Sequence, residues 1–275
     1  MPAILALLSS MVWGFSDFLG GTLSKRRPAI SVIGGSQTFG LIFVSLLAVS
    51  MHDWSLDPIV LRNGALAGVL GFLGLIGFYT ALATGSMGIV APISSLSAVV
   101  PVVIGLVQGE RPAAIQFLGI AVALVGVILA SGPELSGEVD SRPVFLALFA
   151  ALTFGFCVYF MAKGGQINPT MTIASMRAMQ VTIALVVALI VRSIGGLVVK
   201  DLPTLALIGA TDAGANVLFA FAAALGLLSV VSVLGSMYPV VTVILAWWIH
   251  HERLARIQYL GIAATLTGIA MITVG

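Results

Sequence analysis

An internal duplication constrains this chain more than any other feature. Residues 110–121 (ERPAAIQFLGIA) return as residues 252–263 (ERLARIQYLGIA), at an offset of 142 residues in a chain of 275. With that register held, 11 of the 20 positions from Glu110 to Leu129 are identical to their partners. Chance similarity between two apolar helices does not also match Glu-Arg, Ile-Gln and two glycines. We therefore predict two related halves, residues 1–131 and 143–275, joined by a polar linker at residues 132–142.

Composition places both halves in a lipid bilayer. Hydrophobic residues make up 60% of the chain, charged residues make up 8%, and the mean hydropathy is +1.17. So few polar groups cannot cover a water-facing surface. The net charge of +2 does not indicate nucleic acid, because the basic residues lie mostly at segment ends. We expect a multi-pass protein of the cell membrane, the inner membrane in a bacterium, that is a monomer or a weak homodimer.

Cysteine and histidine usage gives no sign of a metal or cofactor. The single cysteine, Cys157, excludes an intrachain disulfide framework and a cysteine-based metal cluster. The cluster His250-His251-Glu252 lacks the i, i+4 spacing of a helical zinc pair, so we interpret it as an interfacial turn. Neither His-Glu-x-x-His nor Gly-x-Ser-x-Gly occurs in the chain. We expect no metal, no cofactor and no enzyme activity.

Counting between turn and charge signals divides the chain into ten apolar segments. A spanning helix needs about 20 mostly apolar residues, and each segment meets that length. We predict helices near 3–23, 29–50, 61–83, 87–108, 112–131, 143–163, 170–192, 203–225, 229–250 and 254–274.

An odd number of spans in each half decides the symmetry. A second half that starts after five crossings runs through the membrane in the opposite sense, so the halves form an inverted repeat. The predicted fold class is an all-α membrane protein of ten transmembrane helices in two inverted five-helix repeats. Glu110 and Glu252 are then expected on opposite membrane faces. Such architecture is typical of secondary transporters, whose binding site lies near the midplane between the halves.

Several motifs also carry a family resemblance. The first predicted helix contains Trp13-Gly14-Phe15, the fourth ends in Gly109-Glu110-Arg111, and the ninth carries Tyr238-Pro239 thirteen residues before Glu252-Arg253. Together they resemble the EamA-type members of the drug/metabolite transporter superfamily, over the whole chain. The resemblance implies ten helices around a central cavity lined mainly by the first, third, fourth, sixth, eighth and ninth. It places the fifth and tenth helices at the periphery.

One proline departs from the repeat. The alignment of the halves expects a proline at Ser97, opposite Pro239, but the chain has Pro101 one turn later. An interruption in the fourth helix therefore need not mirror one in the ninth. The repeated pairs Glu110-Arg111 and Glu252-Arg253 sit at helix junctions, where a carboxylate complements the positive end of the following helix, and we interpret them as structural.

Three charges lie inside predicted spans and away from the span ends: Asp17, Arg177 and Asp212. An ionisable group at that depth costs at least ~2.5–3.5 kcal/mol, so it usually faces a cavity or another charge. Arg177 aligns with Gln37 at an offset of 140, which keeps the position polar in both halves. One hypothesis is that Arg177 attracts an anionic substrate group such as a carboxylate. The alternative is that Arg177 extends to the lipid headgroups.

The two aspartates are candidates for cation and proton binding. Asn216 lies one turn after Asp212, so both share a helix face and can bind an ammonium, a hydroxyl or a cation, or only hold helices together. Asp17 and Asp212 fall at one level, where burial and a like charge favour protonation. The related small multidrug resistance transporters use a carboxylate in their first helix, which favours Asp17. Its alternative role is as an acceptor for backbone near Gly20 and Gly21.

The remaining candidates are polar or aromatic residues of the central helices. Serines in the predicted fourth and ninth helices form matching polar stretches, although serine also serves as a small packing residue in membranes. The predicted substrate-binding residues are Trp13, Gln37, Tyr79, Ser94, Arg177, Asp212, Asn216, Ser236 and Tyr238, and the predicted proton-coupling residues are Asp17 and Asp212.

These observations predict a secondary transporter that moves small organic metabolites, amino-acid-like or drug-like, outward by alternating access with a proton as the candidate coupling ion. The partners are then the small-molecule substrate and the bilayer. The alternatives are an uncoupled facilitator and a channel for small solutes.

The predicted orientation depends on the argument used. The side reached by the odd-numbered helices carries eight basic residues and the other side three. The positive-inside rule therefore puts both termini outside. The family resemblance implies that both termini are inside, and we favour that orientation.

Overall fold

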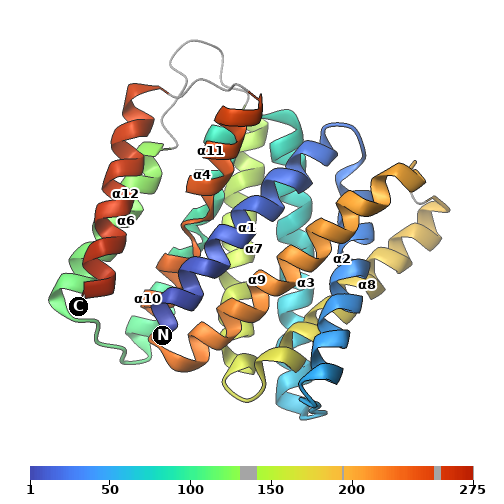
Figure 1. Cartoon of the computed structure of the whole chain (residues 1–275), viewed down its shortest axis with the longest axis horizontal. Coiled ribbons are helices and arrows are strands. Elements are labelled where there is room, and N and C mark those ends of the chain that lie inside the picture. The colour runs from blue at the N-terminus through green and yellow to red at the C-terminus, as the bar shows by residue number, and fades with distance from the viewer. Residues whose placement is uncertain (131–140, 194, 251–254, 275) are drawn as a thin grey trace.

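The computed structural model describes residues 1–130, 141–193, 195–250 and 255–274. Within these ranges the chain is helical (Figure 1). The first half contains α1 (Pro2–Ser24), α2 (Ala29–Ser50), α3 (Pro58–Thr84), α4 (Met87–Ser95), the 3-10 helix η1 (Leu96–Ala98), α5 (Val99–Val107) and α6 (Ala114–Ala130). The second half contains α7 (Ser141–Gly165), α8 (Pro169–Val191), the 3-10 helix η2 (Val199–Asp201), α9 (Leu202–Leu225), α10 (Leu228–Gly235), α11 (Tyr238–His250) and α12 (Arg256–Val274).

Helix starts follow local sequence chemistry. Proline occupies one of the first two positions of α1, α3, α8 and α9, where its missing N–H has no helical partner to lose. Asp57 caps α3 by accepting a hydrogen bond from Ile59 N at 2.7 Å. Asn168 caps α8 in the same way, through Met171 N at 2.7 Å. These signals explain why the predicted boundaries lie close to the observed ones.

Eight apolar segments of the described chain are long enough to cross a bilayer, by length and composition. Two of them contain an interruption: α4, η1 and α5 form one segment, and α10 and α11 form another. The helices α6 and α12 take the places of the predicted fifth and tenth spans with shorter apolar runs, Ala114–Gly126 and Tyr259–Ile272. Eight of the ten predicted spans are thus confirmed as candidates, and the count of ten stays a prediction.

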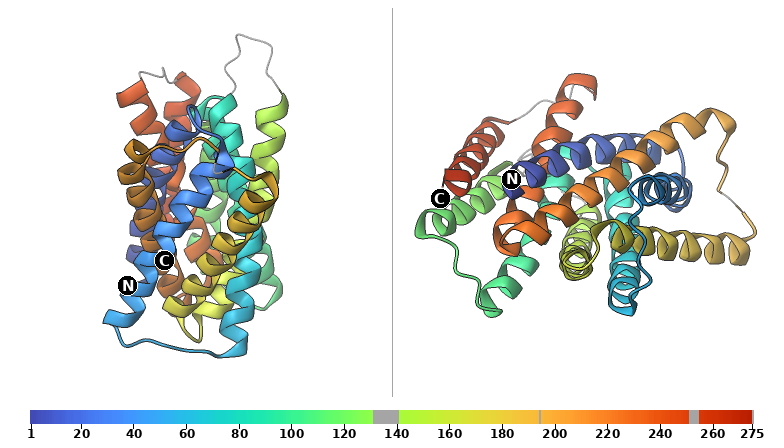
Figure 2. Two further views of the ribbon diagram at one scale, coloured as in Figure 1. Left: turned by 90° about the vertical axis from the view of Figure 1, so that its right-hand side faces the viewer. Right: turned by 60° about the horizontal axis from the view of Figure 1, so that its bottom comes forward.

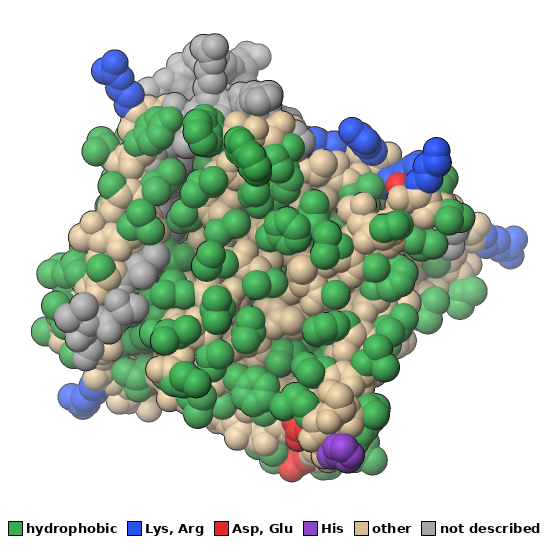
Figure 3. All heavy atoms as spheres, viewed as in Figure 1, with side chains coloured by type: hydrophobic (Ala, Val, Ile, Leu, Met, Phe, Trp, Pro, Cys, Tyr) green, Lys and Arg blue, Asp and Glu red, His purple; other side chains and the backbone are tan. Residues whose placement is uncertain are grey.

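Equivalent helices of the two halves run in opposite directions. In Figure 1 both termini lie on the lower face; α1 rises from that face, whereas α7 descends from the upper one. The end of α5 lies on the lower face and the end of α11 on the upper face. Glu252, whose position we predicted, lies outside the described residues, as do residues 132–140 of the predicted linker. Hydrophobic side chains cover the visible surface, and basic side chains gather mainly along its upper edge (Figure 3).

The two interruptions fall at nearly equivalent places, despite the displaced proline. They lie at Leu96–Ala98 and at Ser236-Met237. Pro101 is the third residue of α5, and Pro239 is the second residue of α11. Both prolines therefore occupy the first turn of a half-helix, where they cost no hydrogen bond. At the offset of 142 residues, Leu96–Ala98 correspond to residues 238–240, so the first interruption lies about two residues later in its repeat than the second, and its proline lies later as well.

The repeated glycines bring α6 and α12 together at one edge of the bundle (Figures 1 and 2). A Cβ on Gly119 would lie 2.9 Å from the carbonyl oxygen of Gly268, and a Cβ on Gly268 would lie 2.6 Å from the backbone nitrogen of Ala123. Side chains there would force the backbones apart. The peripheral pair is therefore held by small-residue packing.

Candidate functional site

A cavity of about 80 Å³ lies among α1, α3, η1 and α7–α11. That space is well above the about 10–15 Å³ that one water molecule needs. Both interruptions contribute to its wall, through Ser97 and Ala98 on one side and Gly235 and Ser236 on the other. Backbone that leaves the helical pattern is found at membrane depth only where protein or a cavity satisfies it. The cavity thus explains where the two helices break.

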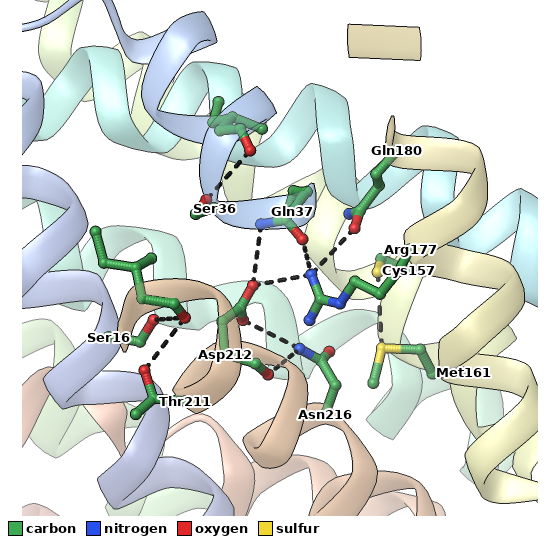
Figure 4. A network of polar contacts seen from close by, with 12 residues as sticks. Ser16, Ser36, Gln37, Cys157, Met161, Arg177, Gln180, Thr211, Asp212 and Asn216 are labelled. Carbon is green, nitrogen blue, oxygen red and sulfur yellow. Dashed lines mark hydrogen bonds and ion pairs between the residues drawn. The ribbon is translucent and has the colours of Figure 1, made fainter. Parts of the chain in front are cut away.

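Arg177 and Asp212 form an ion pair in the wall of the cavity (Figure 4). The distance from Arg177 Nη1 to Asp212 Oδ2 is 2.9 Å, and Arg177 is fully buried. The same nitrogen donates to Gln37 Oε1 and, at 3.0 Å, to Gln180 Oε1. Gln37 Nε2 donates to Asp212 Oδ2 at 3.2 Å. This geometry contradicts the alternative in which Arg177 extends to the headgroups.

Gln37 and Arg177 are repeat-related residues that meet each other. They occupy equivalent positions in the two halves, at an offset of 140 residues, and they are joined by a hydrogen bond between α2 and α8. In an inverted repeat, equivalent positions approach each other where they lie near the pseudo-two-fold axis. The repeat alignment had matched the two residues as counterparts, and the fold makes them direct partners.

Asp212 uses both carboxylate oxygens within the protein. Oδ2 pairs with Arg177 and Gln37, and Oδ1 accepts from Asn216 Nδ2 at 3.0 Å. The same amide nitrogen also donates to the backbone oxygen of Asp212 at 2.6 Å. The two residues share one helix face, as their spacing indicates, and both line the cavity. The negative charge of Asp212 is compensated by Arg177.

Asp17 lines the same cavity without such compensation. Its side chain belongs to α1 and is 9% exposed. Among the described residues, the structure gives its carboxylate no hydrogen bond and no ion pair, and Asp212, a like charge, lines the same cavity. The alternative role as an acceptor for backbone near Gly20 and Gly21 is not observed. Gly20 instead packs against the ring of Tyr79.

Several buried donors at the cavity lack partners in the described part of the chain: Arg177 Nε and Nη2, Gln180 Nε2 and Ser232 Oγ. In Figure 4 the second terminal nitrogen of Arg177 points away from the residues that its first nitrogen contacts. Sequence reasoning missed Gln180, whereas Ser232 belongs to the polar stretch noted in the predicted ninth helix. For Gln180 a signal existed, because it lies three residues after Arg177 and therefore on the same helix face.

Some of the other predicted site residues line the cavity, and others are buried behind its wall. Trp13, Ser236 and Tyr238 line the cavity, and the ring of Trp13 lies 5.5 Å from that of Phe219. Gln37, Tyr79 and Ser94 are buried but do not line it. Ser94 Oγ accepts a hydrogen bond from Tyr238 Oη at 3.0 Å, which joins α4 to α11. Within the described ranges, no group of three or more His, Cys, Asp or Glu side chains is placed to hold a metal ion.

These features define a class: a multi-pass helical membrane protein in which two interrupted helices and a buried ion pair surround a central cavity. The sequence pattern of the EamA-like transporter family matches the chain twice, at residues 1–132 and 141–274. The chain therefore belongs to the EamA-like transporter family and is a membrane transporter of small solutes. A search of curated proteins found no match.

Solved structures extend the comparison of the fold. A structure described as "Crystal structure of protein" superposes with a TM-score of 0.75, covering 99% of this chain and 96% of that one. The two sequences are 14% identical. At that identity the likeness concerns the fold alone.

Proposed function

We propose that the protein is a secondary transporter that exports a small organic solute by alternating access, with the central cavity as the solute site. The observation that carries the proposal is the uncompensated carboxylate of Asp17 in the cavity wall. Isolated buried charges are expensive, and inside membranes such groups mark ion and substrate pathways. An inverted repeat around a central site supplies two related arrangements that open it to either face.

The sum of the charges that line the cavity indicates that Asp17 binds a cation. Arg177 and Asp212 neutralise each other, which leaves the single negative charge of Asp17. A proton or a substrate ammonium group can neutralise it, but the two cannot occupy the carboxylate together. Competition for one carboxylate couples proton entry to solute exit, because each bound cation must leave before the other binds.

The unpartnered donors point to the other end of the solute. Arg177 Nε and Nη2 and Gln180 Nε2 can donate to a carboxylate, while Trp13 and Phe219 provide an apolar wall. A guanidinium suits a carboxylate because its N–H groups match the two oxygens. A zwitterion of the amino-acid type, with its ammonium group at Asp17, satisfies both sets of groups. Asp212 and Asn216 then hold Arg177 in place.

Proteoliposomes with an imposed pH gradient test the coupling. Solutes are first selected by thermal stabilisation of the purified protein against amino acids, nucleosides, sugars and cationic drugs. Wild-type protein should accumulate a stabilising amino acid against its concentration gradient. Asp17→Asn should abolish that accumulation and also weaken solute binding and exchange, because the ammonium group loses its counter-charge. Asp201→Asn is the matched control, because Asp201 pairs with Arg27 at 2.9 Å, away from the cavity, and should leave accumulation intact.

The same vesicles separate the alternatives. A carrier saturates and shows counterflow, whereas a channel does neither. If wild-type protein only equilibrates the solute whatever the gradient, the proton-coupling proposal is wrong and the uncoupled facilitator stands.

A further inference from the structure

Glu110 makes a connection between the two halves that its position in the sequence does not indicate. Its Oε1 accepts a hydrogen bond from Leu228 N at 2.7 Å, and its Oε2 accepts one from Ser229 N at 2.9 Å. These N–H groups belong to the first two residues of α10, where no helical acceptor exists. The interpretation that Glu110 serves the helix that follows it is therefore wrong. It caps a helix of the other half, 118 residues away.

The segment around Glu110 is shaped to hold its carboxylate there. Gly109 has a φ of +95°, a left-handed conformation that favours glycine. The backbone N–H of Glu110 then donates to Gly105 O at 2.9 Å, which folds the residue back over the end of α5. A Cβ on Gly105 would lie 2.6 Å from Glu110 Oε2, so glycine leaves the space that the carboxylate needs.

The two half-helices joined by Glu110 stand between the cavity and one face of the protein. The helix α5 runs outward from η1, and α10 runs inward to Ser236, so both have their inner ends at the cavity wall. They pack against each other, and their outer ends lie on the face that carries the termini. Solute cannot leave the cavity toward that face between these helices unless they separate.

We propose that Glu110 is a latch that holds α5 and α10 together while the cavity is closed toward the face of the termini. The inference rests on the alternating access proposed above. Opening toward that face breaks both charge-assisted hydrogen bonds, and closing restores them. The carboxylate also favours the closed state through the positive end of α10. Glu110 thus sets the balance between the two access states without touching the solute.

Cys157 provides the readout, because it is the single cysteine of the chain and lines the cavity. A membrane-impermeant thiol reagent, methanethiosulfonate ethyltrimethylammonium, is added to one side of oriented proteoliposomes at a time. Glu110→Gln removes the charge and one acceptor oxygen, so labelling from the face of the termini should rise about tenfold or more. Labelling from the opposite face should fall or stay unchanged.

Two further variants make the test specific. Gly105→Ala should reproduce the effect of Glu110→Gln, because its methyl group displaces the carboxylate without removing it. Asp57→Asn is the matched control, since Asp57 caps its own helix α3, which begins on the same face. The Asp57→Asn variant should leave the labelling of Cys157 unchanged.

Counterflow of the selected solute is measured in the same vesicles. Unchanged labelling in both Glu110→Gln and Gly105→Ala, with wild-type counterflow intact, would overturn the latch and leave the proposed function standing. Absence of saturation and counterflow in the wild type would overturn the proposed function instead.

Discussion

The two aspartates of the cavity are buried to nearly the same extent but have different surroundings. Asp212 is 7% exposed and is bound by Arg177, Gln37 and Asn216, whereas Asp17 is 9% exposed and has no such partner among the described residues. The extent of burial therefore does not distinguish their roles. The comparison teaches that a compensated carboxylate holds helices together, and that an uncompensated one is available to a moving cation.

The largest effect on stability is expected from removing the positive charge that pairs with Asp212. Arg177→Met leaves the Asp212 carboxylate buried without its counter-charge, so the free energy of unfolding should fall by about 3–5 kcal/mol. Denaturant titration in detergent micelles measures it. Adding Asp212→Leu should recover much of the loss, because the carboxylate that Arg177 compensated is then removed as well. A loss below about 1 kcal/mol in the single variant would show that the pair does not hold α8 to α9.

A substitution of Asp17, which has no ionic partner, should change the free energy of unfolding far less. Asp17→Asn removes a buried charge that has no ionic partner, so the free energy of unfolding should stay within about 1 kcal/mol of the wild-type value or rise. A double-mutant cycle between Arg177 and each aspartate sharpens the contrast, with a clearly larger coupling energy for Asp212. Destabilisation by Asp17→Asn as large as that by Arg177→Met would remove the distinction between the two carboxylates.

The smallest effect on stability is expected at Tyr79, whose ring packs against Gly20 of α1, the helix that carries Asp17. Its hydroxyl is buried without a hydrogen-bond partner in the described part of the chain. Tyr79→Phe should therefore lower the free energy of unfolding by less than about 0.5 kcal/mol or raise it, since no hydrogen bond is lost and an unpaired buried hydroxyl is removed. Gln37→Met, on the compensated side, takes an acceptor from Arg177 and should cost about 1–3 kcal/mol. Equal costs for the two variants, in the same denaturant titration, would contradict the comparison.

Much of the fold could be predicted because it depends on local signals. Prolines, caps and apolar lengths mark the helices, and the constant offset marks the duplication. The repeated glycines of α6 and α12 mark the faces on which these two helices pack closely. The charges inside spans predicted a polar centre, and Asp17, Arg177 and Asp212 do line one cavity.

The sequence by itself determined which residues share a helix and how far apart they lie along it, because axial position follows from counting along a helix of known rise. Only the tertiary structure decided which residues meet. Arg177 pairs with Asp212 35 residues away, and Glu110 reaches α10 across 118 residues. Such pairings depend on the rotation of each helix about its axis and on its neighbours. Packing of whole helices sets both, and no local periodicity specifies them.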